Sequence, residues 1–274
     1  MQKKAGITWG AILVSLGLIF LLNNFIPQSW PLILIGLGVA FLLATIINRL
    51  GGLAISGMLF LVLGLILQYQ TISGYWASWL FLWPLVTTAL GAGLIFGNLF
   101  GMGGKKVRLT GWVWFLTGLL FTTLSYAWYS QSPATYSWAW IILGLGLQFV
   151  LVSLLSRLPG LAIPGVILAG IGGLLYWQNA TGDWASWSYA WPLVTGAVGL
   201  SFIVAVLTGL RSRALLWVGL YFVFISAVFF FIFGAFFARD WALFTYWPLL
   251  LILLGVGILY HGYTRRRSAA KPSA

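Results

Sequence analysis

The sequence has no cysteine, only two acidic residues and a single histidine among its 274 residues, and charged residues make up 6% of it. Without cysteine, the chain can form no disulfide and supplies no thiolate for zinc or an iron–sulfur cluster. An ordinary soluble domain carries roughly 25% charged residues, so this chain has too few to cover a surface exposed to water. A soluble globular fold is therefore excluded.

Apolar runs dominate what remains: 62% of the residues are hydrophobic. Runs of about 18 residues or more are long enough to cross a bilayer core of about 30 Å. The first run resembles a signal peptide, but no small-x-small cleavage site follows it, and we expect a retained helix. The predicted fold class is all-α, a polytopic integral membrane protein with about ten transmembrane helices. The predicted spans are 7–24, 31–47, 51–68, 80–100, 109–128, 137–155, 161–177, 187–207, 214–236 and 243–260.

A short phrase that begins with tryptophan recurs five times, and a glycine follows each of these tryptophans eight positions later. Proline comes directly after the tryptophan in four copies, and Ala139 replaces it in the third. The tryptophans are Trp30, Trp83, Trp138, Trp191 and Trp247. Such internal repetition indicates tandem copies of one structural unit. We predict five helical hairpins, at 1–50, 51–104, 105–158, 159–210 and 211–264, followed by a basic tail at 265–274.

The second and fourth copies are the most alike. GLAISG at 52–57 matches GLAIPG at 160–165, and WASW occurs at 76–79 and again at 184–187. The same offset of 108 residues continues without a gap through the two Trp-Pro-Leu-Val-Thr segments. Duplication of a helical hairpin is the simplest explanation.

The repeated phrase has a physical interpretation. Proline suits the first position of a helix, because the N–H that it lacks would have no partner there. Tryptophan favours the headgroup level of a membrane, so the five tryptophans are predicted interface anchors. Glycine lets neighbouring helix backbones approach closely, which is one way that transmembrane helices associate. The predicted helix-packing glycines are Gly17, Gly38, Gly64, Gly91, Gly118, Gly146, Gly172, Gly199 and Gly255.

The charges are sorted by side. Thirteen of the 14 Lys and Arg residues fall on one side of the ten-helix topology, whereas Arg239, Asp183 and Asp240 fall on the other. Short loops rich in Lys and Arg stay in the cytoplasm, so both termini are predicted to be cytoplasmic. We expect the basic side to contact anionic lipid headgroups.

The tryptophans are also unevenly distributed, since 13 of the 17 lie near the predicted outer ends of the helices. Anchoring of an outer surface that has few charges accounts for this distribution. The alternative is that rings in the outer loops, at 69–79, 130–136 and 178–186, form a lid or a contact face for lipid or a partner.

Few groups in the chain could perform chemistry. Asp183 and Asp240 lie in predicted outer loops and His261 lies on the inner side, so they cannot meet across a bilayer. No predicted span contains Asp, Glu, Lys, Arg or His, which argues against proton or ion coupling. We therefore expect no catalytic residue, no cofactor, no metal site and no nucleic-acid partner.

Gln148 is the most conspicuous polar residue within a predicted span. A hydrogen bond between helices, worth roughly 0.6–2 kcal/mol, accounts for such a residue. The alternative is a place in a polar pathway across the membrane.

Residues 10–43, GAILVSLGLIFLLNNFIPQSWPLILIGLGVAFLL, carry a family resemblance. A glycine-rich helix that ends near Asn23-Asn24 and is followed by Trp-Pro-Leu-x-Leu-Ile-x-x-Gly resembles the LiaI/LiaF-like transmembrane region of bacterial envelope proteins. The resemblance implies a bacterial inner-membrane location. It also implies a role in envelope stress responses, in which some members partner with a regulatory kinase or a membrane-associated protein.

Two functions are compatible with these observations. The first is a non-catalytic scaffold or modulator in the bacterial cell envelope, with other envelope membrane proteins as partners. The second is a carrier or channel for an uncharged or hydrophobic substrate, because transporters are often built from repeats. A carrier would need a cavity near the membrane midplane at an interface between repeats, where we expect Gln148 and glycines to line it.

Overall fold

The computed structural model describes residues 30–131 and 138–237, together with the single positions 10, 14, 17, 21, 248, 249, 252, 255 and 256. Within these residues the chain is helical and contains no strand. Six helical segments are long and apolar enough to cross a membrane, and α9 with α10, which are bent by 58° at their junction, would make a seventh. The helices are α2 (Leu32–Asn48), α3 (Leu53–Ser73), α4 (Trp79–Leu82), α5 (Pro84–Gly97), α6 (Lys105–Gln131), α7 (Ala139–Ser156), α8 (Ala162–Thr181), α9 (Trp187–Ala190), α10 (Pro192–Leu207) and α11 (Arg213–Phe237).

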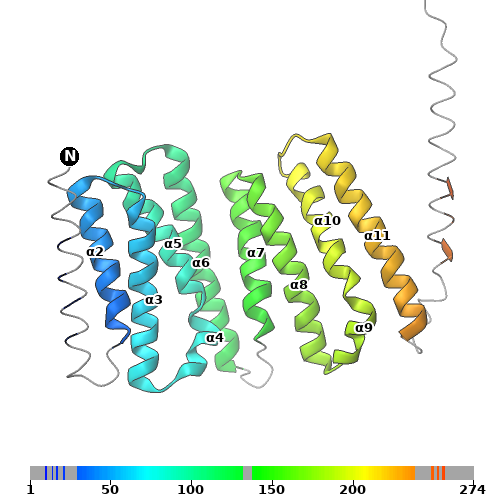
Figure 1. The fold of residues 1–274 in the computed structure, drawn as a ribbon, viewed down its shortest axis with the longest axis horizontal. Helices are drawn as coiled ribbons and strands as arrows, with labels where there is room; N and C mark the ends of the chain where they lie inside the picture. Colours follow the sequence, from blue (N-terminus) through cyan, green and yellow to red (C-terminus); the bar gives the residue numbers. More distant parts are fainter. Residues whose placement is uncertain are drawn as a thin grey trace, which may run out of the picture.

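The long helices stand side by side in chain order and alternate in direction (Figure 1). Four turns join them at one end, uppermost in Figure 1, at 49–52, 98–104, 157–161 and 208–212. Every Lys and Arg of the ranges 30–131 and 138–237 lies in or beside one of these four turns. Asp183 lies at the opposite end, directly after α8. The described helices therefore separate basic and acidic residues along their long axes.

The two described ranges are copies of one arrangement. The first half (residues 30–131) contains α2 to α6, and the second half (residues 138–237) contains α7 to α11. Each α-helix of the first half has its counterpart about 108 residues later, down to the one-turn helices α4 and α9. The offset found in the sequence is thus also an offset between structural elements.

The side chains inside the array are mostly small or polar, whereas those on its surface are large and apolar. Three of the largest fully buried side chains are glutamines, Gln70, Gln148 and Gln178. By contrast, Leu116 is 58% exposed and Trp217 is 70% exposed. A soluble protein places such residues the other way round, whereas hydrocarbon around the helices would solvate the apolar side chains and leave polar groups to bond within the protein.

Glycines bring the most closely packed helices into backbone contact. A Cβ atom on Gly38 of α2 would lie 2.5 Å from the backbone nitrogen of Leu61 on α3. A Cβ atom on Gly199 of α10 would lie 2.6 Å from the carbonyl oxygen of Gly219 on α11. The closest pairs are α2–α3, α5–α6, α7–α8 and α10–α11. Each pair joins the last helix of one sequence repeat to the first helix of the next, so the hairpin boundaries drawn from the sequence fall inside these pairs.

The Trp-Pro segments break the helices that contain them. The hydropathy predicts continuous spans at 80–100 and 187–207, but the structure divides each into a one-turn helix and a longer helix. The division falls at Trp83-Pro84 in the first half and at Trp191-Pro192 in the second. Proline causes the break because it has no N–H for the preceding turn and its ring clashes with that turn's carbonyl.

Candidate functional site: buried amides and an apolar groove

Gln148 holds three helices together. Its side chain lies on α7 and is fully buried. Its Oε1 accepts a hydrogen bond from Thr87 Oγ1 of α5 at 2.9 Å, and its Nε2 donates to Thr117 Oγ1 of α6 at 3.2 Å. Both ends of the amide are therefore bonded within the protein.

The partners of Gln148 could not be found from the sequence. Thr87 and Thr117 lie 61 and 31 positions away from it, and no local spacing links residues so far apart. Each threonine hydroxyl also bonds to its own helix, Thr87 to the Pro84 carbonyl and Thr117 to the Val113 carbonyl, both at 2.7 Å. Thr117 donates to its own helix and accepts from the amide through a lone pair, whereas Thr87 shares its one hydroxyl hydrogen between the Pro84 carbonyl and Gln148 Oε1.

The other two buried glutamines fasten turns at the end of the array opposite the basic turns. Gln70 Nε2 donates to Ser78 Oγ at 3.1 Å, and in the second half Gln178 Nε2 donates to Ser186 Oγ at the same distance. Asp183 adds a helix cap there, because its Oδ1 accepts from the backbone N–H of Ser186 at 3.2 Å. The tryptophan-containing turns that follow α3 and α8 are thus bonded to the helices that precede them.

The predicted interface anchors have different environments. Trp30, Trp138 and Trp191 are 44%, 45% and 41% exposed, whereas Trp83 is only 4% exposed. Trp247 lies outside the described residues.

Trp83 is buried because α7 covers it. Its ring packs edge-on against Phe121, with the ring centroids 6.4 Å apart. A Cβ atom on Gly144 of α7 would lie 2.9 Å from the ring. The Trp83 indole nitrogen is buried and has no hydrogen-bond partner among the described residues. The ring therefore fills space between helices in the place where the sequence predicts a headgroup contact.

The predicted helix-packing glycines fall into two groups. Seven of them lie where an added Cβ atom would come within about 3 Å of a neighbouring helix: Gly38, Gly64, Gly91, Gly118, Gly146, Gly172 and Gly199. A Cβ atom on Gly17 or Gly255 would meet no atom within 4 Å, and most residues around these two lie outside the described part of the chain.

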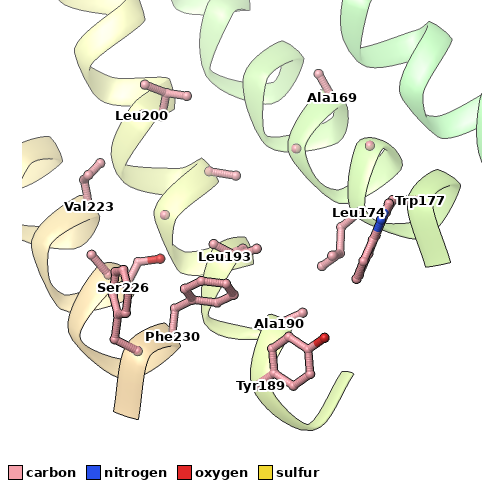
Figure 2. A pocket seen from close by; sticks show the side chains of 16 residues that line it. Ala169, Leu174, Trp177, Tyr189, Ala190, Leu193, Leu200, Val223, Ser226 and Phe230 are labelled. Carbon is pink, nitrogen blue, oxygen red and sulfur yellow. The ribbon is translucent and has the colours of Figure 1, made fainter. Parts of the chain in front are cut away.

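An apolar groove lies between α8, α10 and α11. It has a volume of about 660 Å³, within the roughly 300–1,000 Å³ of ordinary small-molecule sites. Figure 2 shows it running along the helices, with Ala169 and Leu200 toward one end and Tyr189 at the other. Gln148 is not among its lining residues. The groove is at an interface between repeats, as a carrier would need, and Gly170, Gly173 and Gly196 line it, whereas the sequence predicts a lining of glycines together with Gln148.

The groove offers almost nothing for polar recognition. Ser226 carries the only hydroxyl among the lining residues of α8, α10 and α11, and its Oγ donates to the Pro192 carbonyl oxygen at 2.6 Å. The polar atoms of Trp177 and Tyr189 belong to the end of the groove nearest α9. The walls therefore suit a hydrocarbon ligand and not a charged one.

Two tyrosines form a hydrogen bond at the end of the array that carries Asp183 in the second half. The hydroxyl oxygens of Tyr75 and Tyr129 are 2.6 Å apart. This hydrogen bond, together with some loss of solvation, raises the pKa of Tyr75 above its usual value of 10.0. The phenol stays protonated to a higher pH because the bond stabilises its neutral form.

Groups suited to chemistry are scarce in the described part of the chain. Its only acid is Asp183, whose described role is the helix cap. Residues 30–131 and 138–237 contain no cluster of three or more His, Cys, Asp or Glu side chains that could hold a metal ion. Asp240 and His261 lie outside the described residues.

No protein-family model, curated protein or solved structure matches this chain.

Proposed function

We propose that the protein is a non-catalytic scaffold or modulator embedded in the bacterial cell membrane. It has ten transmembrane helices in five hairpins, with both termini in the cytoplasm. The observation that carries this proposal is the set of buried glutamines, since Gln148 bonds to two neighbouring helices and the Nε2 atoms of Gln70 and Gln178 each donate to a serine of the turn that follows their helix. Polar groups used in this way favour one fixed arrangement, as a scaffold needs.

The distribution of charge supports the orientation. The described cations gather at the turns at 49–52, 98–104, 157–161 and 208–212. Short basic loops remain in the cytoplasm, and each basic residue near an anionic membrane surface contributes about 1 kcal/mol of attraction. Anionic headgroups at that face, and other envelope membrane proteins within the bilayer, are the partners of this proposal.

The absence of cysteine makes the orientation directly testable, because every introduced thiol is the only one in the chain. Lys106→Cys and Ala185→Cys place a thiol at opposite ends of the described helices. We expect a membrane-impermeant maleimide to label Ala185→Cys in intact cells and to label Lys106→Cys only after lysis. The reverse pattern would contradict the topology.

The scaffold role is tested in cells and in vesicles. Deletion of the gene is expected to shift the dose of a cell-wall antibiotic at which an envelope-stress reporter responds, and wild-type protein is expected to restore it. Purified protein in proteoliposomes is expected to turn over neither lipid nor solute. Reproducible turnover would refute the scaffold.

A carrier for a hydrophobic substrate is the second candidate, and the apolar groove is the observation that favours it. In that case proteoliposomes would show flux of an apolar fluorophore, and Gly173→Leu would abolish the flux by filling the groove. If a ligand binds in the groove but the proteoliposomes show no flux, the scaffold is the better account.

A further inference from the structure

The chemistry of the groove restricts what can occupy it. Every residue that lines it is uncharged, and the hydroxyl of Ser226 is already bonded to the Pro192 carbonyl. A polar ligand would lose its hydrogen bonds to water and find few replacements in the groove. The occupant that fits these walls is therefore a hydrocarbon.

The first half of the protein shows what the second half lacks. Ala169 and Gly173 of α8 correspond, 108 residues earlier, to Leu61 and Leu65 of α3. A Cβ atom added to Gly173 would meet nothing within 4 Å, so the space beside this residue is open. The chain thus carries hydrocarbon side chains at these positions in one half and leaves them out in the other.

The dimensions of the groove match one leaflet of a bilayer. Ala169 and Trp177 both line it and are eight residues apart on α8, a distance of about 12 Å along the helix at about 1.5 Å per residue. Half of a bilayer's hydrocarbon core is about 15 Å thick. The groove ends beside α9, where Trp177 and Tyr189 supply the amphipathic rings that favour the headgroup level.

A helix that packed against α10 and α11 as α7 packs against α5 and α6 would leave the groove open. Where the two halves meet, α7 packs against Trp83, which precedes α5, and against Thr117 of α6. The counterparts of these two residues, Trp191 and Ile225, do not line the groove. The repeat pattern therefore favours an occupant from outside the chain.

From these observations we infer that the groove binds one acyl chain of a phospholipid, which enters sideways from the leaflet on the α9 side of the protein. The chain lies along α8, between α10 and α11, with its carbonyl end toward Trp177 and Tyr189. Selection acts on the hydrocarbon and not on the headgroup. This lipid site does not depend on the scaffold role, because a structural lipid fits a scaffold and a carrier equally well.

Photolabelling in nanodiscs tests the site. The full chain is placed in phosphatidylcholine nanodiscs in which some lipids carry a diazirine within one acyl chain, and labelled peptides are identified by mass spectrometry. We expect the label to concentrate on 169–177 and 223–231. Gly173→Leu is expected to lower this labelling about tenfold, the scale on which a misfitting group changes occupancy of an apolar pocket.

Two control variants protect this test against misfolding. Gly160→Leu makes the same change at an exposed glycine before α8, where an added Cβ atom also meets nothing within 4 Å, and it is expected to leave the labelling unchanged. Leu65→Ala opens the matching place in the first half and is expected to raise the labelling of α3. Equal labelling of all lipid-facing helices, or full labelling of Gly173→Leu, would overturn the proposal.

A photoreactive amino acid in place of Leu193, within the groove, identifies the occupant from the protein side. Capture of phospholipid supports the site. Capture of residues 243–260 of the same chain, or of a second copy of the protein, would show that the groove is a protein contact and would overturn the lipid assignment.

Discussion

The two halves of the protein solve one packing problem in opposite ways. In the first half, Thr88 of α5 faces Gly118 of α6, and the threonine hydroxyl bonds to the Pro84 carbonyl of its own helix at 3.0 Å. The counterparts in the second half are Gly196 of α10 and Ser226 of α11, so the glycine and the hydroxyl have changed places.

In both halves a hydroxyl bonds to the proline carbonyl, but in the second half this bond runs between two helices. The Ser226 hydroxyl crosses to the Pro192 carbonyl of the neighbouring helix at 2.6 Å. A Cβ atom on Gly196 would lie 2.5 Å from that hydroxyl oxygen, so there is space for one small polar side chain and not for two. The hydroxyl that bonds to the proline carbonyl thus comes from α5 itself in the first half and from α11 in the second.

The most disruptive way to test the equivalence of the halves is to separate their helices. Gly91→Leu and Gly199→Leu each place a side chain against the backbone of the next helix, and each is expected to cost about 3 kcal/mol or more because backbone cannot move aside cheaply. Thermal unfolding in detergent, followed by circular dichroism, measures the loss. Tolerance of one change and not of the other would show that the halves pack differently.

A smaller effect is expected where the halves are joined. Gln148→Leu removes the amide that bonds to Thr87 and Thr117, and we expect a loss of about 1–2 kcal/mol of stability. Gln68→Leu is the matched control, since its Oε1 is buried with no partner among the described residues, and it is expected to be neutral. If the two changes lower the unfolding temperature equally, the Gln148 amide does not stabilise the contact between the two halves.

Exchange of the hydroxyl between helices tests the comparison most directly. Gly118→Ser alone brings a hydroxymethyl group against Thr88 and is expected to cost about 1–3 kcal/mol by overpacking. The double variant Thr88→Gly with Gly118→Ser recreates the arrangement of the second half and is expected to recover most of that loss. A double variant less stable than the single one would mean that the two helix pairs are not interchangeable.

The smallest expected effect concerns a feature of the first half alone. Tyr75 and Tyr129 are bonded there, whereas Asp183 and Phe237 occupy the corresponding positions of the second half. Because the pKa of Tyr75 is raised, the bond stabilises the fold below pH 10 or so and is lost as the pH rises through that raised pKa. Tyr129→Phe is expected to lower the pKa of Tyr75, measured by the absorbance of tyrosinate. An unchanged titration would refute the coupling.

Much of the helical arrangement follows from the sequence. The spans predicted at 31–47 and 137–155 agree within about two residues with α2 and α7, because an uninterrupted apolar run has few other ways to satisfy its backbone in a membrane. The offset of 108 residues follows from matching segments of the sequence. Hydropathy and internal repetition can both be read from a single sequence.

Other features depend on distance in space. The sequence does not indicate that Gly199 meets Gly219 of the following repeat, since a glycine shows that a close approach is possible but not which helix approaches. It marks Trp83 and Trp191 alike, yet only Trp83 is covered by α7. The groove is harder still to foresee, because it consists of side-chain volume that is missing from three helices at once.

The repeat has a consequence for how such a chain can grow. Each half consists of four long helices, so a polypeptide that passes through one copy emerges where it began. Insertion or loss of a copy would therefore leave the direction of every downstream helix unchanged, whereas loss of one helix would reverse the direction of all helices that follow it. The array can thus gain or lose helices in pairs without any change in the direction of the helices that remain.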